Sequence, residues 1–185
     1  MYSDSVRLRQ GALYQVHPVI LHPVGTTGYE PELANAVVET VNILQDWLVL
    51  HTGKGLSFGP LNELVLPEPL VIPDPSVSYL QVVPYVEQYL SRTWGWPLSG
   101  NLGHVIILRG SGGYAGYSPL PEGHGHMVVV GDAFCEALLG HYDEAKRIME
   151  LDPRYSYVRA TVNGAIFTLC HELLHLVGLD DEHDP

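Results

Sequence analysis

Two histidines four residues apart, His171 and His175, constrain the fold of this chain more than any other feature. On an α-helix, residues four apart lie on the same face, so both imidazoles can reach one metal ion. With Ile166 placed at zero and about 100° per residue, the histidines fall at about 140° and 180°. Apolar residues lie within about 80° of Ile166, namely Leu169, Cys170, Leu173, Leu174 and Val177. The sequence therefore predicts a helix that packs by one side and presents the histidines on the other.

The N-terminal half predicts a strand followed by a long helix. Residues 14–25 are apolar and β-branched, which favours a strand. In residues 29–53, Pro31 suits the first turn of a helix and Gly53 suits its end. Helical spacing of apolar residues predicts its buried side: Leu33, Val37, Val41, Leu44 and Leu48.

The rest of the sequence predicts further strands and helices, which would form a sheet backed by helices. Residues 55–75 read as a short strand and a proline-interrupted segment, and residues 83–95 as a helix. Strands are expected at 104–110 and 126–132, on either side of the glycine-rich segment 110–125. Asp132 is expected to cap a helix over 133–151, and Asp152 with Pro153 to start a helix that runs to Gly178. This order predicts an α/β or α+β fold in a single domain, residues 1–185.

Composition limits the classes of partner. The net charge of −12, from 21 acidic and 9 basic residues, disfavours binding to nucleic acid. The sequence contains no apolar run of membrane-spanning length and no visible signal peptide. We therefore expect a cytoplasmic protein with no membrane partner, the alternative being a secreted domain whose leader has been removed. Cys135 and Cys170 are expected to be buried thiols rather than a disulfide.

The end of the sequence adds chemistry to the helix. Glu172 lies beside the metal-binding axis, where its carboxylate can act as a base. Gly178 can adopt the left-handed conformation that ends a helix and turns the chain, so that Asp181 returns towards the metal. The pattern HExxHxxGxxD, formed by His171, Glu172, His175, Gly178 and Asp181, resembles the zinc signature of the metzincin metallopeptidases. It is most similar to the form found in the small snapalysin-type proteases.

This resemblance implies a function and a fold. It implies a zinc-dependent metalloendopeptidase that holds one Zn²⁺ through His171, His175 and Asp181 and uses Glu172 as general base. It also implies a mixed, twisted sheet of about four to five strands, with a backing helix and a C-terminal zinc-binding helix. The segment around "GGYAG" would line a cleft and pair with an extended peptide substrate, the alternative being an ordinary hairpin loop.

The sequence also departs from the family. No methionine follows Met149, so the methionine turn and the lower subdomain have no counterpart among these residues. We therefore expect either a minimal relative, with a cleft open on one side, or a sequence cut short. His183 is an alternative third ligand, because three imidazoles are a common set for catalytic zinc. His124 and His126 are further candidates, although a polar turn is the simpler interpretation of both.

Three other functions stay open. The motif is similar to HGxLHxxGxDH of the bacterial endoribonucleases of ribosomal RNA maturation, but Glu172 replaces the glycine and Asp181 replaces the third histidine. A non-catalytic zinc-binding domain is the second alternative, although structural zinc sites are mostly built from cysteine and histidine. The third is an interaction module descended from an enzyme.

Overall fold

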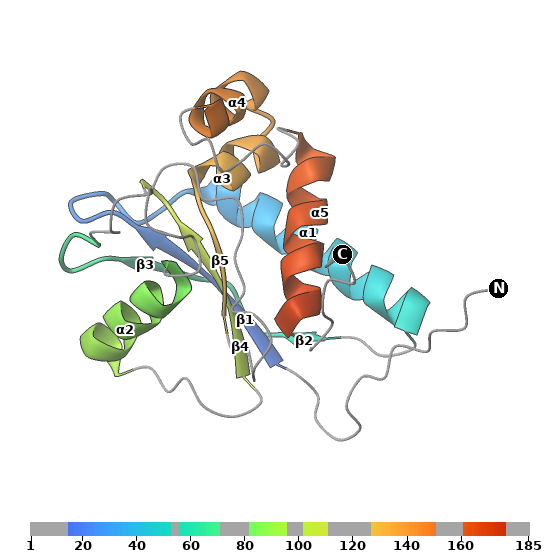
Figure 1. The fold of residues 1–185 in the computed structure, drawn as a ribbon, viewed down its shortest axis with the longest axis horizontal. Helices are drawn as coiled ribbons and strands as arrows, with labels where there is room; N and C mark the ends of the chain where they lie inside the picture. Colours follow the sequence, from blue (N-terminus) through green and yellow to red (C-terminus); the bar gives the residue numbers. More distant parts are fainter. Residues whose placement is uncertain are drawn as a thin grey trace, which may run out of the picture.

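The computed structural model describes residues 15–52, 56–70, 82–95, 102–110, 127–150 and 161–176. These residues form a parallel β-sheet with helices on both faces (Figure 1). The strands are β1 (Gln15–His22), β2 (Ser57–Phe58), β3 (Asn62–Val65), β4 (Leu102–Leu108) and β5 (Met127–Val130). The helices are α1 (Pro31–Thr52), α2 (Val82–Trp94), α3 (Asp132–Leu138), α4 (Tyr142–Glu150) and α5 (Val162–Leu176).

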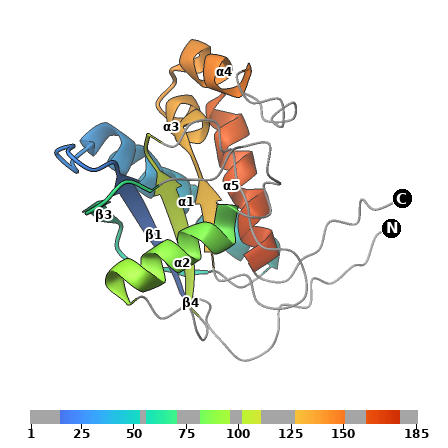
Figure 2. The ribbon, with the colours of Figure 1, turned by 60° about the vertical axis from the view of Figure 1, so that its left-hand side comes forward.

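The sheet is built outwards from β1. The strand order is β2-β1-β4-β5, and β3 also pairs with β1. β4 pairs along β1 from Gln15↔Leu102 to Leu21↔Leu108, and β5 pairs with β4 from His104↔Met127 onwards. The chain moves from β1 to β2 and β3 through α1, and then back past β1 to β4 through α2. Because parallel crossovers are right-handed, these opposite movements put α1 and α2 on opposite faces. Figure 2 shows α2 on one face and α1 and α5 on the other.

Burial on both faces explains the composition of the central strands. All four residues of β5, the segment "MVVV", are buried, and so are residues 103–108 of β4. A parallel sheet covered by helices on both sides favours such continuous apolar runs over alternation of apolar and polar residues. The sequence therefore identified β4 and β5 through composition and not through periodicity.

Helix α1 follows the predicted pattern closely. It begins at Pro31, whose missing N–H costs nothing in the first turn. The predicted inward-facing residues are all buried: Leu33, Val37, Val41, Leu44 and Leu48. The prediction of this helix and of its buried side is confirmed.

The single helix predicted over 133–151 is wrong, because the segment forms two helices. α3 ends at Leu138, and Gly140 has a φ of +81°, a left-handed conformation that suits glycine and turns the chain before α4. Asp132 is the first residue of α3, and Gly131 occupies the N-cap position. The predicted cap is therefore also wrong: the Asp132 carboxylate accepts a hydrogen bond from the Gly110 amide at 3.0 Å.

Helix α5 begins later than predicted. Thr161 precedes the helix, and its Oγ1 accepts a hydrogen bond from the Gly164 amide at 3.0 Å. This is an N-cap, which satisfies one of the amides left without a partner at the start of a helix. The prediction of an unbroken helix from Asp152 is therefore wrong. Residues 151–160, and Gly178 at the predicted end of the helix, lie outside the described residues.

The predicted fold class is confirmed, with one difference in the sheet. The described residues form an α/β structure with five strands and with a helix, α5, that includes His171 and His175. A mixed sheet was expected, whereas each described pairing is parallel. β4 and β5 therefore cannot be joined as a hairpin, which excludes that interpretation of the segment between them. The "GGYAG" loop itself lies outside the described residues.

The buried and exposed sides of α1 give a first testable prediction. Leu33 is 0% exposed and Leu50, on the same helix, is 79% exposed. We expect Leu33→Ala to lower the free energy of unfolding by about 2–5 kcal/mol, through lost burial and the cavity left behind. Leu50→Ala should change it by less than about 0.5 kcal/mol. Urea unfolding of both variants measures this, and equal effects would contradict the assignment of the two sides of α1.

Candidate functional site

Helix α5 combines a core side with an outer side that carries the motif. Its buried apolar residues, which belong to the core, are Ala165, Leu169 and Leu173. Ile166, Cys170 and Leu174 are partly buried and pack against the core. Of the apolar side predicted from the sequence, only Val177 lies outside the described residues. The packing prediction for α5 is confirmed for the rest.

The motif lies in the second half of α5. His171 and Glu172 are both half-buried, so each is accessible from one side. The ring of His171 stacks on that of Phe167, with 6.3 Å between ring centroids and 25° between planes. His175 follows one turn later in the same helix, although its side chain lies outside the described residues. The prediction that the HExxH motif is helical is confirmed.

The residue types of the α5 motif are those that zinc sites use. Two imidazoles one helical turn apart, with a carboxylate next to the first, are groups that zinc binds or that act beside it. Among the described side chains, no three His, Cys, Asp or Glu residues gather closely enough to form a complete metal site. The candidates for the third ligand, Asp181 and His183, lie outside the described residues, as do His124 and His126.

Both cysteines are free thiols, as predicted, but the prediction that both are buried holds for Cys135 alone. Cys135 is fully buried in α3, and burial raises its thiol pKa well above the usual range. Cys170, which precedes His171, is half-buried, and burial raises its pKa as well. A raised pKa keeps a thiol protonated, whereas metal binding requires the thiolate. In the metal-free protein the Cys170 thiol is therefore protonated.

A second polar group surrounds Arg109, which follows β4. Its Nε and Nη2 donate to the two carboxylate oxygens of Glu30, at 2.9 and 2.7 Å. Its Nη1 donates to Asp132 at 2.8 Å and to Glu136 at 3.1 Å. Burial alone would lower the pKa of Arg109, but the hydrogen bond to Glu30 and the nearby negative charges raise it. Arg109 is therefore held as a cation among three carboxylates.

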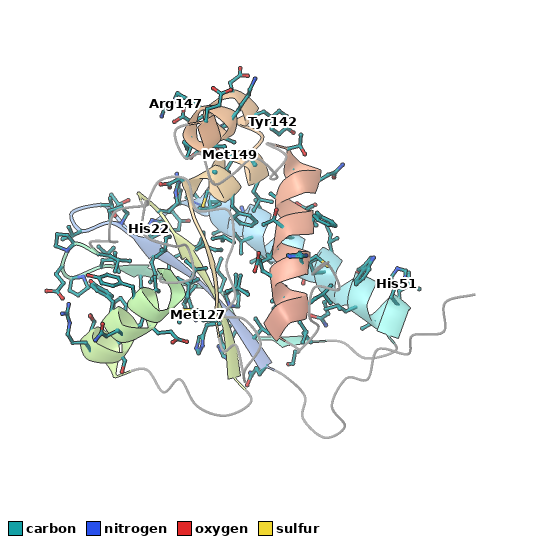
Figure 3. The ribbon with its side chains drawn as sticks, viewed as in Figure 1. His22, His51, Met127, Tyr142, Arg147 and Met149 are labelled. Atoms are coloured by element: carbon teal, nitrogen blue, oxygen red, sulfur yellow. The ribbon has the colours of Figure 1, made fainter. Side chains whose placement is uncertain are left out.

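This Arg109 cluster, defined as Arg109, Glu30, Asp132 and Glu136, extends in two directions. On one side, Glu63 accepts a hydrogen bond from the Glu30 amide at 3.0 Å and lies 2.9 Å from Nε2 of His22. On the other side, Glu136 lies 2.8 Å from Nδ1 of His141. Figure 3 shows the position of His22 near the end of β1. The contacts link β1, β3, β4, α1 and α3 at one end of the sheet.

The Arg109 cluster lies at the carboxyl ends of β1 and β4, which neighbour each other in the sheet. From β1 the chain continues towards β2 and β3, and from β4 it continues towards β5, so the connections diverge between these two strands. Such a switch point is where open α/β sheets commonly place ligand sites. Sequence patterns did not predict this cluster, although the charged residue directly after the apolar run "HVIIL" was a visible signal.

The two polar regions lie towards different ends of the sheet. α3 and α4 follow β5 at the carboxyl end, beside the Arg109 cluster. α5 starts near α3 and α4 and runs along the sheet towards the end where its strands begin (Figures 1 and 2). The HExxH motif, in the second half of α5, is therefore displaced from the Arg109 cluster.

Comparisons with known proteins give no information about the site, which therefore has to be interpreted from its own residues. No protein-family model matches the chain, and no curated protein was found to be similar to it. Within the described ranges, no helix is both long and apolar enough to cross a lipid bilayer. The functional inference therefore depends on the motif of α5.

The Arg109 cluster gives a second prediction, on stability. Arg109→Met removes the cation and leaves three carboxylates close together, so we expect a loss of about 3 kcal/mol in the free energy of unfolding. Arg92→Met is the matched control, because the Arg92 side chain is 68% exposed in its ion pair with Glu68. It should lose less than about 1 kcal/mol. Urea unfolding of the two variants measures these losses. Equal losses in both variants would contradict the central role of Arg109.

Proposed function

We propose that this protein is a zinc-dependent peptidase whose active site is built on α5. One observation carries the proposal: His171, Glu172 and His175 lie on a helix whose other side is fixed in the core by Leu169 and Leu173. By helical spacing, His171 and His175 share the face of α5 that points away from Leu169 and Leu173, and His171 and Glu172 are half-buried. Such a rigid scaffold is what positions metal ligands with useful precision.

The ligands proposed for zinc are His171, His175 and Asp181, with His183 as the alternative third ligand. Three protein ligands of this type are typical of catalytic zinc, which keeps one position open. When bound, zinc would supply Lewis acidity, polarising the peptide carbonyl and lowering the pKa of a coordinated water. The HExxHxxGxxD pattern supports this set, through its resemblance to the metzincin signature.

Glu172 is proposed as the general base. It directly follows the first histidine and is half-buried, so its carboxylate is partly shielded and yet accessible. In this role it accepts a proton from the attacking water and delivers a proton to the departing amine. The proton ends on the leaving group, and Glu172 is regenerated as a carboxylate.

A peptide is the proposed substrate, and the cytoplasm the proposed site of action. The net charge of −12 opposes binding to a phosphate backbone, which disfavours the endoribonuclease alternative. Glu172 also disfavours it, because that family has a glycine at the corresponding position. A domain that only binds zinc would have no use for a base beside the metal, so the presence of Glu172 favours catalysis.

Metal content provides the third prediction. Purified protein loaded with Zn²⁺ should hold one ion per chain by elemental analysis, and His171→Ala or His175→Ala should remove most of it. His51→Ala is the matched control, since His51 is exposed on α1 and should not affect zinc content. Asp181→Ala and His183→Ala identify the third ligand by which of them loses zinc. A parent protein that binds no zinc would refute the proposed function.

Glu172→Gln provides the fourth prediction. The amide keeps the shape of the side chain but cannot accept the proton, so peptide hydrolysis should fall by a factor of about 10² to 10⁴ while zinc content stays at one ion per chain. Glu39→Gln, at an exposed position of α1, serves as the control and should keep full activity. The assay is cleavage of a mixed peptide library, followed by mass spectrometry. Undiminished cleavage by Glu172→Gln would exclude Glu172 as the base.

A further inference from the structure

Phe167 is an apolar residue on the outer side of α5. Its side chain is 72% exposed, whereas Leu169 and Leu173 on the same helix are buried. A single exposed apolar residue is ordinary on a protein surface and needs no functional explanation. Phe167 is informative because the side chain next to it on the helix is His171, a proposed metal ligand.

Phe167 and His171 are four residues apart, so their side chains lie one turn apart on α5. Their ring centroids are 6.3 Å apart and the ring planes differ by 25°. The ring planes are nearly parallel, and the centroid separation is within the range at which aromatic rings attract each other. His175 follows His171 at the same spacing. Phe167 therefore comes first in an i, i+4, i+8 series that continues with the two histidines.

The stack has a consequence for metal binding. The outer torsion of a histidine side chain has broad energy wells, so an exposed imidazole can rotate. A metal ligand has to present one ring nitrogen in a fixed direction, and proteins commonly fix the ring through a contact outside the ligand set. The phenyl ring of Phe167 carries no hydrogen-bonding group, and it stacks on the His171 ring. It can therefore restrict the ring without occupying a donor atom.

We propose that Phe167 is a positioning residue for metal binding by His171. The proposal rests on the proposed zinc site of α5 and adds to it a residue that the motif does not contain. Phe167 restrains the imidazole before the metal arrives, so less conformational freedom is lost when zinc binds. Its exposure is then explained, because a residue that restrains a ligand on the outer side of α5 has to lie on that side as well.

The fifth prediction compares Phe167→Leu with Phe167→Tyr. Leucine keeps the apolar character and the helix propensity but removes the aromatic ring, and tyrosine restores the ring. We expect Phe167→Leu to bind Zn²⁺ about three- to tenfold more weakly than the parent in a competition titration with a chromogenic chelator. Phe167→Tyr should bind within about twofold of the parent. Leu50→Ala, which removes an exposed apolar side chain from α1, controls for general surface effects.

Nuclear magnetic resonance of the metal-free protein gives an independent readout. A stacked phenyl ring shifts the resonances of the His171 ring protons, so Phe167→Leu should move them and Phe167→Tyr should largely retain them. Urea unfolding should give equal stability for the parent and both variants, because an exposed substitution rarely changes stability by more than about 0.5 kcal/mol.

The possible results separate this inference from the proposed function. Weaker zinc binding and shifted His171 resonances in Phe167→Leu alone would support the positioning role. If the parent binds zinc and Phe167→Leu binds it equally tightly, Phe167 has no positioning role while the proposed function stands. If the parent binds no zinc, the proposed function fails and the metal role of Phe167 fails with it, whatever the resonances show.

Discussion

The parallel pairing of β1 with β4 is the interaction on which the rest of the structure depends. It runs the length of both strands and brings together segments that are more than 80 residues apart in the chain. β2 and β3 add to one edge of β1, and β5 adds to the free edge of β4. Because both faces of this sheet are apolar, helices must cover both of them. The positions of α1, α2 and α5 follow from that requirement.

The polar groups are distributed in a way that fits this scaffold. The Arg109 cluster lies where β1 and β4 end, and there it joins the start of α1 to the start of α3 through Glu30 and Asp132. Its carboxylates surround a single guanidinium, so most of its hydrogen-bonding capacity is directed inwards. We interpret the cluster as structural, although such positions often bind ligands in α/β proteins. The proposed chemistry lies on α5 instead.

Sequence patterns were sufficient to predict a helix or strand where the residues of that segment alone determine its structure. Pro31 and the spacing of Leu33 to Leu48 defined α1, and the apolar runs defined β4 and β5. Sequence patterns failed where the role of a residue depends on residues that are distant in the chain. Asp132 has the chemistry of a helix cap, but Gly110 and Arg109, brought close by the pairing of β4 with β5, engage its carboxylate. Parallel rather than mixed pairing could not be predicted for the same reason, since strand direction depends on the crossovers.

In the candidate site, too, some features follow from the local sequence and others do not. The helical spacing of His171 and His175 is local, so the sequence was enough to place both on one helix. The stack between Phe167 and His171 depends on side-chain conformation and was not predicted, although its i, i+4 spacing was visible. Core packing connects these features: a slip of one residue in α5 would rotate every side chain by about 100°. Burial of Leu169 and Leu173 therefore stabilises α5 and also fixes which positions of the helix face the core and which face away from it.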